Sequence, residues 1–225
     1  MCALRPTQAT HAGMCVLMHD AEPLKPSNTG WLIADVVADT WAFGWSRTAM
    51  DAGLTALLND PQWQPYVVFP QEFVQPPSRV VQTVAERMDA INFDSAVRSG
   101  RAPAAQNAKR PLFILLDATW PEARKMFRKS PHLDRYLVLS LHPDHISRYK
   151  LRRSRRDDHF CTAEVAALCL DLAGDQRAAQ TLEAYLDVYT HHYLQAKHQL
   201  PPDWNSAAHQ QLAALQLPVD AAIRS

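Results

Sequence analysis

An apolar run at residues 112–116 most constrains how this chain can fold. Pro111 precedes the run and Asp117 ends it, and an unbroken apolar run of this length is typical of a strand buried on both faces. Pro121 and the acidic residue after it fit the first turn of a helix that begins at once. The pattern therefore predicts a central strand of a sheet, followed directly by a helix.

Three side chains follow this predicted strand at its carboxyl end, namely Asp117, Thr119 and Trp120. Ligands of open α/β sheets bind at that edge, because loops there are free of packing constraints and a helix N-terminus offers unpaired N–H groups. Asp117 could equally cap the helix, and Trp120 could fill the core. Position alone leaves both interpretations open.

Strand and helix patterns alternate along the rest of the chain, which predicts an α/β fold with a largely parallel sheet and helices on both faces. Residues 31–37 fit either a strand or a buried helix, and residues 80–88 show helical spacing after Pro76 and Pro77. The other predicted strands are residues 14–18, 66–70 and 136–141, and the predicted helices are residues 50–58, 122–129, 162–173 and 177–199.

The length of 225 residues suits one domain with a substantial core. We expect a single domain over residues 1–200 and a peripheral tail over residues 201–225, with a surface linker at residues 92–110. No apolar run approaches the roughly 20 residues that a membrane span requires. Residues 1–14 lack the pattern of a secretory signal, so we expect a cytoplasmic protein.

Two absences in the sequence narrow the cofactor chemistry. The four cysteines, Cys2, Cys15, Cys161 and Cys169, are scattered without a C-x-x-C pair, so we expect free thiols and no metal. The six glycines form neither a dinucleotide-binding fingerprint nor a P-loop, which argues against NAD and ATP. A cofactor without phosphates, held by apolar walls and backbone groups, suits the predicted carboxyl edge better.

Charge is distributed unevenly although the net charge is zero. Between Arg98 and Arg156 the chain has fifteen Lys or Arg and four Asp or Glu, whereas the remainder has eight and nineteen. A basic segment in an otherwise acidic chain is typical of a surface that binds a polyanion, although such charges can also form an ordinary solvated face.

Residues 117–126, Asp-Ala-Thr-Trp-Pro-Glu-Ala-Arg-Lys-Met, closely resemble the signature of DTW-domain proteins. Three other stretches resemble family motifs in the family's order: a His-x-x-Glu-x-x-Lys-x-Ser-Asn-Thr-Gly-like block at residues 19–30, Tyr-x-Leu-Arg at residues 149–152, and Thr-x-Glu at residues 162–164. The resemblance runs from about His19 to about Tyr193. Many bacterial members carry an N-terminal Cys cluster that looks like a zinc knuckle, and this sequence lacks it.

The resemblance implies a SPOUT-like fold, in which the C-terminal part is threaded into a trefoil knot that binds S-adenosylmethionine. It further implies a bacterial tRNA-uridine aminocarboxypropyltransferase, which transfers the 3-amino-3-carboxypropyl group from S-adenosylmethionine to N3 of a uridine and releases 5'-methylthioadenosine. Two alternatives stay open: a SPOUT-like RNA methyltransferase with the same cofactor, and a noncatalytic RNA-binding module. We expect a monomer that binds tRNA, without metal or membrane.

Three residues are the predicted catalytic groups. Asp117 is the candidate general base or the acceptor that orients uracil, Trp120 offers a stacking face, and Arg152 could hold the cofactor carboxylate or an RNA phosphate. Lys25 could instead pair with a neighbouring acid, and Thr162 and Glu164 could be ordinary first-turn residues. The predicted cofactor-binding residues are Phe69, Pro70, Thr119, Leu139, Ser140, Leu141, Tyr149, Leu151, Thr162 and Glu164. The predicted RNA-binding residues are Lys25, Arg124, Lys125, Arg128, Arg153, Arg155 and Arg156.

Overall fold

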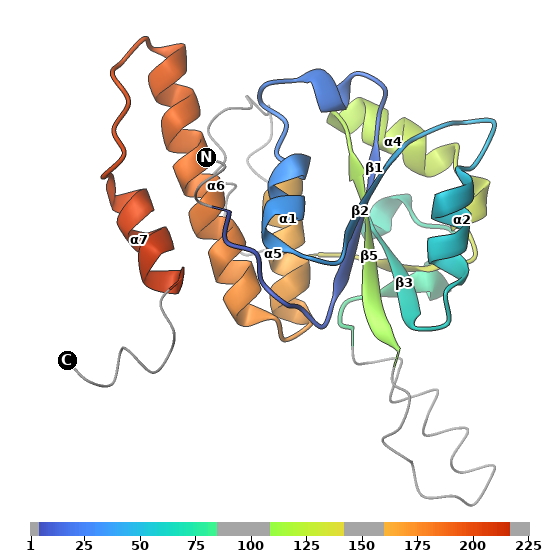
Figure 1. Cartoon of the computed structure of the whole chain (residues 1–225). Coiled ribbons are helices and arrows are strands. Elements are labelled where there is room, and N and C mark those ends of the chain that lie inside the picture. Colours follow the sequence, from blue (N-terminus) through green and yellow to red (C-terminus); the bar gives the residue numbers. More distant parts are fainter. Residues whose placement is uncertain (1–4, 85–108, 142–159, 217–225) are drawn as a thin grey trace, which may run out of the picture. The chain divides into compact units, whose positions relative to one another are not determined.

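The computed structural model describes residues 5–84, 109–141 and 160–216 of the chain (Figure 1). These residues divide into two compact units. Of the described residues, the sheet unit comprises 11–20, 41–84 and 109–141, and the helical unit comprises 5–10, 21–40 and 160–216. Each unit is built from segments that are distant in sequence. The prediction of a single domain over residues 1–200 stays a prediction.

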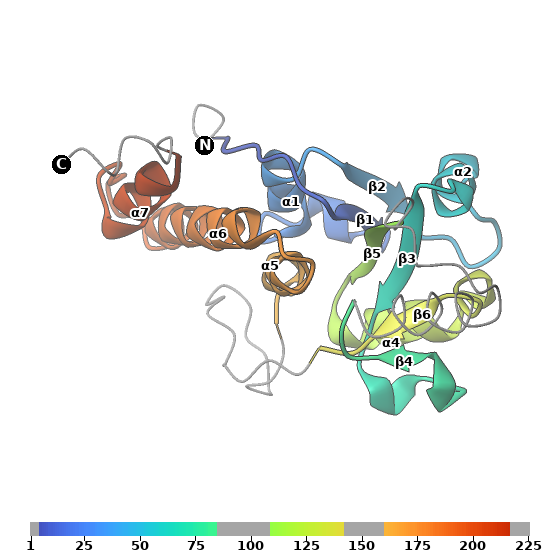
Figure 2. The same ribbon diagram turned by 90° about the horizontal axis from the view of Figure 1, so that it is seen from below.

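The sheet unit is organised around six parallel strands in the order β2-β1-β5-β3-β6-β4 (Figure 2). β5 pairs with β1 on one side and with β3 on the other, which confirms that the apolar run forms a central strand. The predicted α/β class with a parallel sheet is likewise confirmed. The strands are β1 (Gly13–Met18), β2 (Thr40–Gly44), β3 (Trp63–Val68), β4 (Val80–Val81), β5 (Arg110–Asp117) and β6 (Leu137–Leu139).

Both faces of β5 are buried, which explains why its apolar run has no polar alternation. Leu112 and Ile114 pack into one hydrophobic core with side chains of the neighbouring strands. Phe113 points to the opposite face, where its ring lies 6.1 Å from that of Tyr66, and Leu115 follows on the same face. All four of these β5 side chains are at most 2% exposed.

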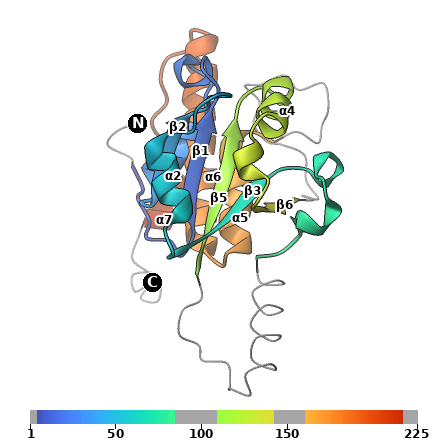
Figure 3. The same cartoon turned by 90° about the vertical axis from the view of Figure 1, so that its right-hand side faces the viewer.

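Two helices of the sheet unit, α2 (Ala52–Asn59) and α4 (Trp120–Arg128), cover the same face of the sheet (Figure 3). Leu54 and Leu58 of α2 and Met126 of α4 belong to the core that contains Leu112 and Ile114. These contacts anchor α4 directly above the end of β5.

The helical unit is built around α6 (Gln176–Lys197), which packs against α1 (Gly30–Val36), α5 (Thr162–Leu172) and α7 (Ala207–Gln216) (Figure 1). α5 ends at Leu172, and Gly174 follows two residues later with a φ of +84°, the left-handed conformation that glycine adopts without strain. Short 3-10 helices span Glu22–Leu24, Gln71–Phe73, Pro77–Arg79 and Pro131–Leu133.

Several sequence expectations are resolved or corrected. Residues 31–37 lie mainly in helix α1, so the helical alternative was right. The helical spacing predicted for residues 80–88 was wrong at its start, because Val80 and Val81 form the edge strand β4. Within the tail from residue 201, α7 is an ordered helix whose Leu212 is only 2% exposed. Residues 92–108 of the expected linker lie outside the described residues, and the trefoil knot stays a prediction.

Candidate functional site at the carboxyl edge of the sheet

The carboxyl ends of β1 and β5 form a topological switch point. β1 leads through α1 to β2, its neighbour on one side, whereas β5 leads through α4 to β6 on the other side. Open α/β sheets bind ligands outside the strand ends where the connections diverge in this way. Met18 and Asp117 are paired in register, and the backbone N–H of His19 donates to the Asp117 carbonyl at 3.0 Å. The switch point therefore brings His19 and Asp117 together.

Asp117 has no exposed surface, although it carries a carboxyl group and stands at the end of a strand. Strand alternation places its side chain on the same face as Phe113 and Leu115, away from α4. Thr119, not Asp117, is the N-cap of α4, so the capping alternative for Asp117 was wrong. A buried carboxylate is costly without compensating polar contacts, and such groups concentrate at functional sites.

Thr119 and Glu122 form a capping box at the start of α4. The Glu122 Oε2 atom accepts from the Thr119 backbone N–H at 2.9 Å and from the Thr119 hydroxyl at 2.5 Å. Its other oxygen, Oε1, lies 3.6 Å from Nδ1 of His19. The cap thus fixes a carboxylate beside the imidazole at the end of β1.

The His19 ring is held from a second side by Trp45. The two rings are stacked with centroids 5.9 Å apart and planes 19° apart. Trp45 is fixed in turn, because its indole N–H donates to Ser130 Oγ at 2.8 Å and its backbone N–H donates to the Met18 carbonyl at 2.8 Å. His19, Glu122 and Trp45 were not among the predicted site residues, although the polar residues after the first strand were the available signal.

Trp120 belongs to an aromatic cluster on the α4 face of the sheet. Its ring stacks on Phe69 at 5.6 Å and meets Phe73 edge to face at 5.6 Å. Phe127 covers Phe69 with a centroid distance of 4.3 Å, and the Arg124 guanidinium lies 4.7 Å from the centre of the Phe73 ring. Trp120 is half-buried, so it contributes to packing and keeps part of its surface at the edge of the sheet.

The predicted cofactor-binding residues at the carboxyl ends of β3 and β6 lie side by side. The Phe69 N–H donates to the Leu139 carbonyl at 3.1 Å, and Ser140 Oγ accepts from the Gln71 N–H at 3.1 Å. The side chains of Phe69, Leu139 and Ser140 are buried, whereas Pro70 and Leu141 are half-buried. A ligand at this edge would meet Pro70, Leu141 and backbone groups.

The helical unit holds three other predicted site residues in structural contacts. Lys25 pairs with the fully buried Glu22, with 2.5 Å between Nζ and Oε2. Glu164 caps α5 by accepting from the Cys161 N–H at 2.8 Å, and Thr162 is the first residue of the same helix. These contacts match the structural alternatives, while the proposed ligand roles stay predictions. The predicted residues Tyr149, Leu151, Arg152, Arg153, Arg155 and Arg156 lie outside the described residues.

Four cations stand on the exposed surface of α4 and its C-terminal end: Arg124, Lys125, Arg128 and Lys129. Ala123 and Met126 of the same helix are buried. A basic face therefore begins next to the capping box and Trp120.

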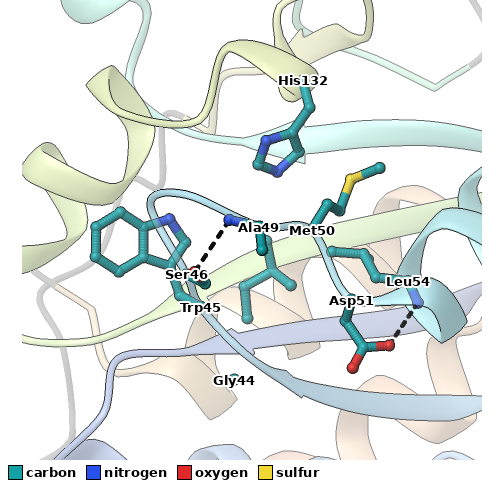
Figure 4. Close-up of a pocket in the computed structure, with 9 residues that line it drawn as sticks. Gly44, Trp45, Ser46, Ala49, Met50, Asp51, Leu54 and His132 are labelled. Atoms are coloured by element: carbon teal, nitrogen blue, oxygen red, sulfur yellow. Dashed lines mark hydrogen bonds between the residues drawn. The ribbon is translucent and has the colours of Figure 1, made fainter.

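A small pocket lies between the loop after β2 and His132 (Figure 4). Trp45, Met50 and Leu54 form part of its wall. The Asp51 carboxylate accepts hydrogen bonds from the N–H groups of Gly53 and Leu54, so it caps the N-terminus of α2. Burial lowers the pKa of His132, which favours its neutral form.

Free, buried thiols are found at Cys15, Cys161 and Cys169, and burial raises the pKa of each. Within the described residues, no three His, Cys, Asp or Glu side chains are grouped as a metal site requires. The helices among those residues are all too short or too polar to cross a bilayer.

Fold and site together define a parallel α/β protein with polar and aromatic side chains at the switch point of its sheet and a basic helix beside them. Comparison with known families gives the more particular assignment. The family model of the DTW domain matches residues 1–194, and the chain belongs to this family. Membership is consistent with a tRNA-modifying function. No solved structure matches the chain.

Proposed function

We propose that this protein transfers the 3-amino-3-carboxypropyl group from S-adenosylmethionine to N3 of a uridine in tRNA and releases 5'-methylthioadenosine. The observation that carries the proposal is the position of the family signature. Asp117, Thr119 and Trp120 stand at the switch point, the edge of a parallel sheet where ligands bind.

The chemistry of the described residues at this edge supports S-adenosylmethionine as the donor. The molecule has no phosphates, and its adenine needs apolar contacts, which the half-buried Pro70 and Leu141 at the ends of β3 and β6 can supply. The carboxylate of Asp117 has the charge that suits a ligand carrying a sulfonium and an ammonium. When bound, S-adenosylmethionine supplies a methylene carbon activated by its sulfonium. The protein has to align that carbon with the base, and such alignment lowers a barrier by about 7 kcal/mol or more.

The basic surface of α4 supports tRNA as the acceptor. Arg124, Lys125 and Arg128 are exposed, and cations on one helix face can neutralise neighbouring phosphates. Trp120, at the start of the same helix, keeps part of its ring exposed for stacking on a base. Helix α4 thus carries both the cations expected to contact phosphates and the aromatic ring expected to stack on the base.

The test uses S-adenosylmethionine labelled either in its carboxyl group or in its methyl group. We expect the carboxyl label to enter tRNA and the methyl label to appear in methylthioadenosine. Entry of the methyl label into tRNA would instead identify a methyltransferase. Retention of tRNA without transfer of either label, together with no calorimetric binding of S-adenosylmethionine, would identify a noncatalytic RNA-binding module.

A further inference from the structure

We propose that His19 accepts the N3 proton of the uridine, with Glu122 as the positioning residue that orients and stabilises the imidazole. This inference rests on the proposed transfer reaction and assigns the proton acceptor within it. It follows from the surroundings of His19.

His19 stands where an acceptor for the substrate proton is needed. It is the first residue after β1, and its backbone is hydrogen-bonded to Asp117 across the switch point. Its side chain is 19% exposed, whereas Asp117 has no exposed surface. An imidazole is also ordinarily a better base than a carboxylate at neutral pH. Of these two side chains, His19 is therefore better placed to take a proton from RNA.

The Nδ1 atom of His19 indicates which ring nitrogen would act. Nδ1 is buried and has no hydrogen-bond partner among the residues that the structure describes, although Glu122 Oε1 lies 3.6 Å away. Buried polar atoms without a partner are uncommon and call for an explanation. Hydrogen bonds between catalytic groups are often long without substrate and shorten when it binds. A proton on Nδ1 directed at Glu122 would leave the lone pair of Nε2 as the acceptor.

Glu122 is held in place for this role. Its Oε2 atom is bound by the backbone N–H and the hydroxyl of Thr119, so its carboxylate cannot rotate away without breaking the cap of α4. A fixed negative charge beside His19 stabilises the imidazolium that forms when Nε2 takes a proton. Trp45 restrains the ring plane by stacking. Glu122 and Trp45 together restrain the orientation of the His19 ring.

The proposed step is balanced in atoms and electrons. The Nε2 lone pair takes the proton from uracil N3, and the electron pair left on N3 forms the new bond to the methylene carbon of S-adenosylmethionine. The bond from that carbon to sulfur breaks, and its electron pair stays on sulfur. Methylthioadenosine leaves as a neutral thioether and needs no proton. The imidazolium then releases its proton to solvent.

The experiment measures the single-turnover transfer rate with donor and tRNA both saturating. We expect His19→Gln and His19→Ala to lower this rate by about 10²–10⁴-fold, the usual contribution of a general base, with unchanged affinity for donor and tRNA. Added imidazole should partly restore the rate of His19→Ala in a saturable manner. Glu122→Gln, whose amide oxygen can still accept in the capping box, should cause a smaller loss of rate.

His132→Gln is the matched control, because His132 is another half-buried histidine close to Trp45, and it should keep the wild-type rate. An unchanged rate in His19→Gln overturns the inference. A loss that imidazole does not restore, accompanied by weaker donor binding or a lower melting temperature, shows a structural role and also overturns it. Absence of transfer by the wild-type protein would instead overturn the proposed function, and the inference with it.

Discussion

Asp117 does not cap helix α4, because Thr119 is its N-cap. We therefore expect Asp117→Ala to keep the fold and to abolish transfer, since the acceptor that orients the base or the donor is lost. Asp117→Asn should keep part of the RNA affinity. Transfer with carboxyl-labelled donor and thermal unfolding, measured on the same samples, check both statements. Full transfer by Asp117→Ala would contradict the role assigned to this carboxylate.

Trp120 packs in the aromatic cluster, and we expect it also to bind a base or adenine. Because its ring stacks on Phe69 and meets Phe73 edge to face, Trp120→Ala should lower the free energy of unfolding by about 3 kcal/mol. The exposed part of the ring should also contribute about 1–3 kcal/mol to binding of a base or of adenine. Trp120→Phe keeps an aromatic ring and is the control for both quantities. Chemical denaturation and calorimetric titration separate them, and unchanged binding by Trp120→Ala would leave packing as the role of this residue.

At the scale of elements, the sequence predicted β5 and α4 well because their signals are local. An unbroken apolar run and a Pro-Glu first turn specify a buried strand and a helix directly after it, without information from the rest of the fold. The cap itself was not predicted, because Thr119 and not Asp117 provides it. The edge strand β2 escaped prediction because its residues are half-buried or exposed and include a glycine. β4 consists of two valines, too short to show a period.

The contact between His19 and Glu122 could not be predicted from the sequence either. It depends on β1 and β5 being adjacent, and nothing local to residues 19 or 122 specifies that pairing. What the sequence did specify was that polar residues follow two buried strands. The sequence could therefore predict that the site lies at an edge of the sheet. Its geometry follows only once it is known which strands pair.

The packing of α7 on α6 should depend on pH through His192. Burial, followed by the charges of His209 and His191, lowers the pKa of His192 in the folded protein. The unfolded chain then binds a proton more readily, so stability is full above the unfolded pKa of about 6.5 and decreases as the pH falls through that value. His192 Nε2 and His209 Nε2 lie 2.9 Å apart, and protonation of both rings would replace their hydrogen bond with repulsion.

Hydrogen exchange of the α7 amides at about pH 7.5 and about pH 5.5 measures this effect. Protection should fall at the lower pH in the wild-type protein and change less in His192→Gln. The amides of β5 serve as the internal reference, because they lie at the centre of the sheet. Equal protection of α7 at both pH values would contradict the prediction.

At the scale of the whole molecule, the separation of charge predicts where tRNA binds. The segment from Arg98 to Arg156 is basic, whereas the rest of the sequence is acidic. The described part of the basic segment includes the exposed cations of α4. Cations that neutralise phosphates release bound counterions, so each contact steepens the dependence of affinity on salt. An acidic remainder would repel tRNA and direct it to the basic segment.

Six such contacts should give a plot of log affinity against log salt concentration a slope of about −4 to −5, at roughly 0.7–0.9 per contact. Replacing Arg153, Arg155 and Arg156 together with alanine should flatten the slope by about two units if all three contact phosphates. The affinity for S-adenosylmethionine should not change, because none of the three is assigned to its pocket. Arg47→Ala combined with Lys197→Ala removes two exposed cations outside the basic segment and should leave the slope unchanged. An unchanged slope in the triple variant would show that those arginines form a solvated face, and the phosphate contacts would then be expected along residues 124–129 of α4 and its C-terminal end.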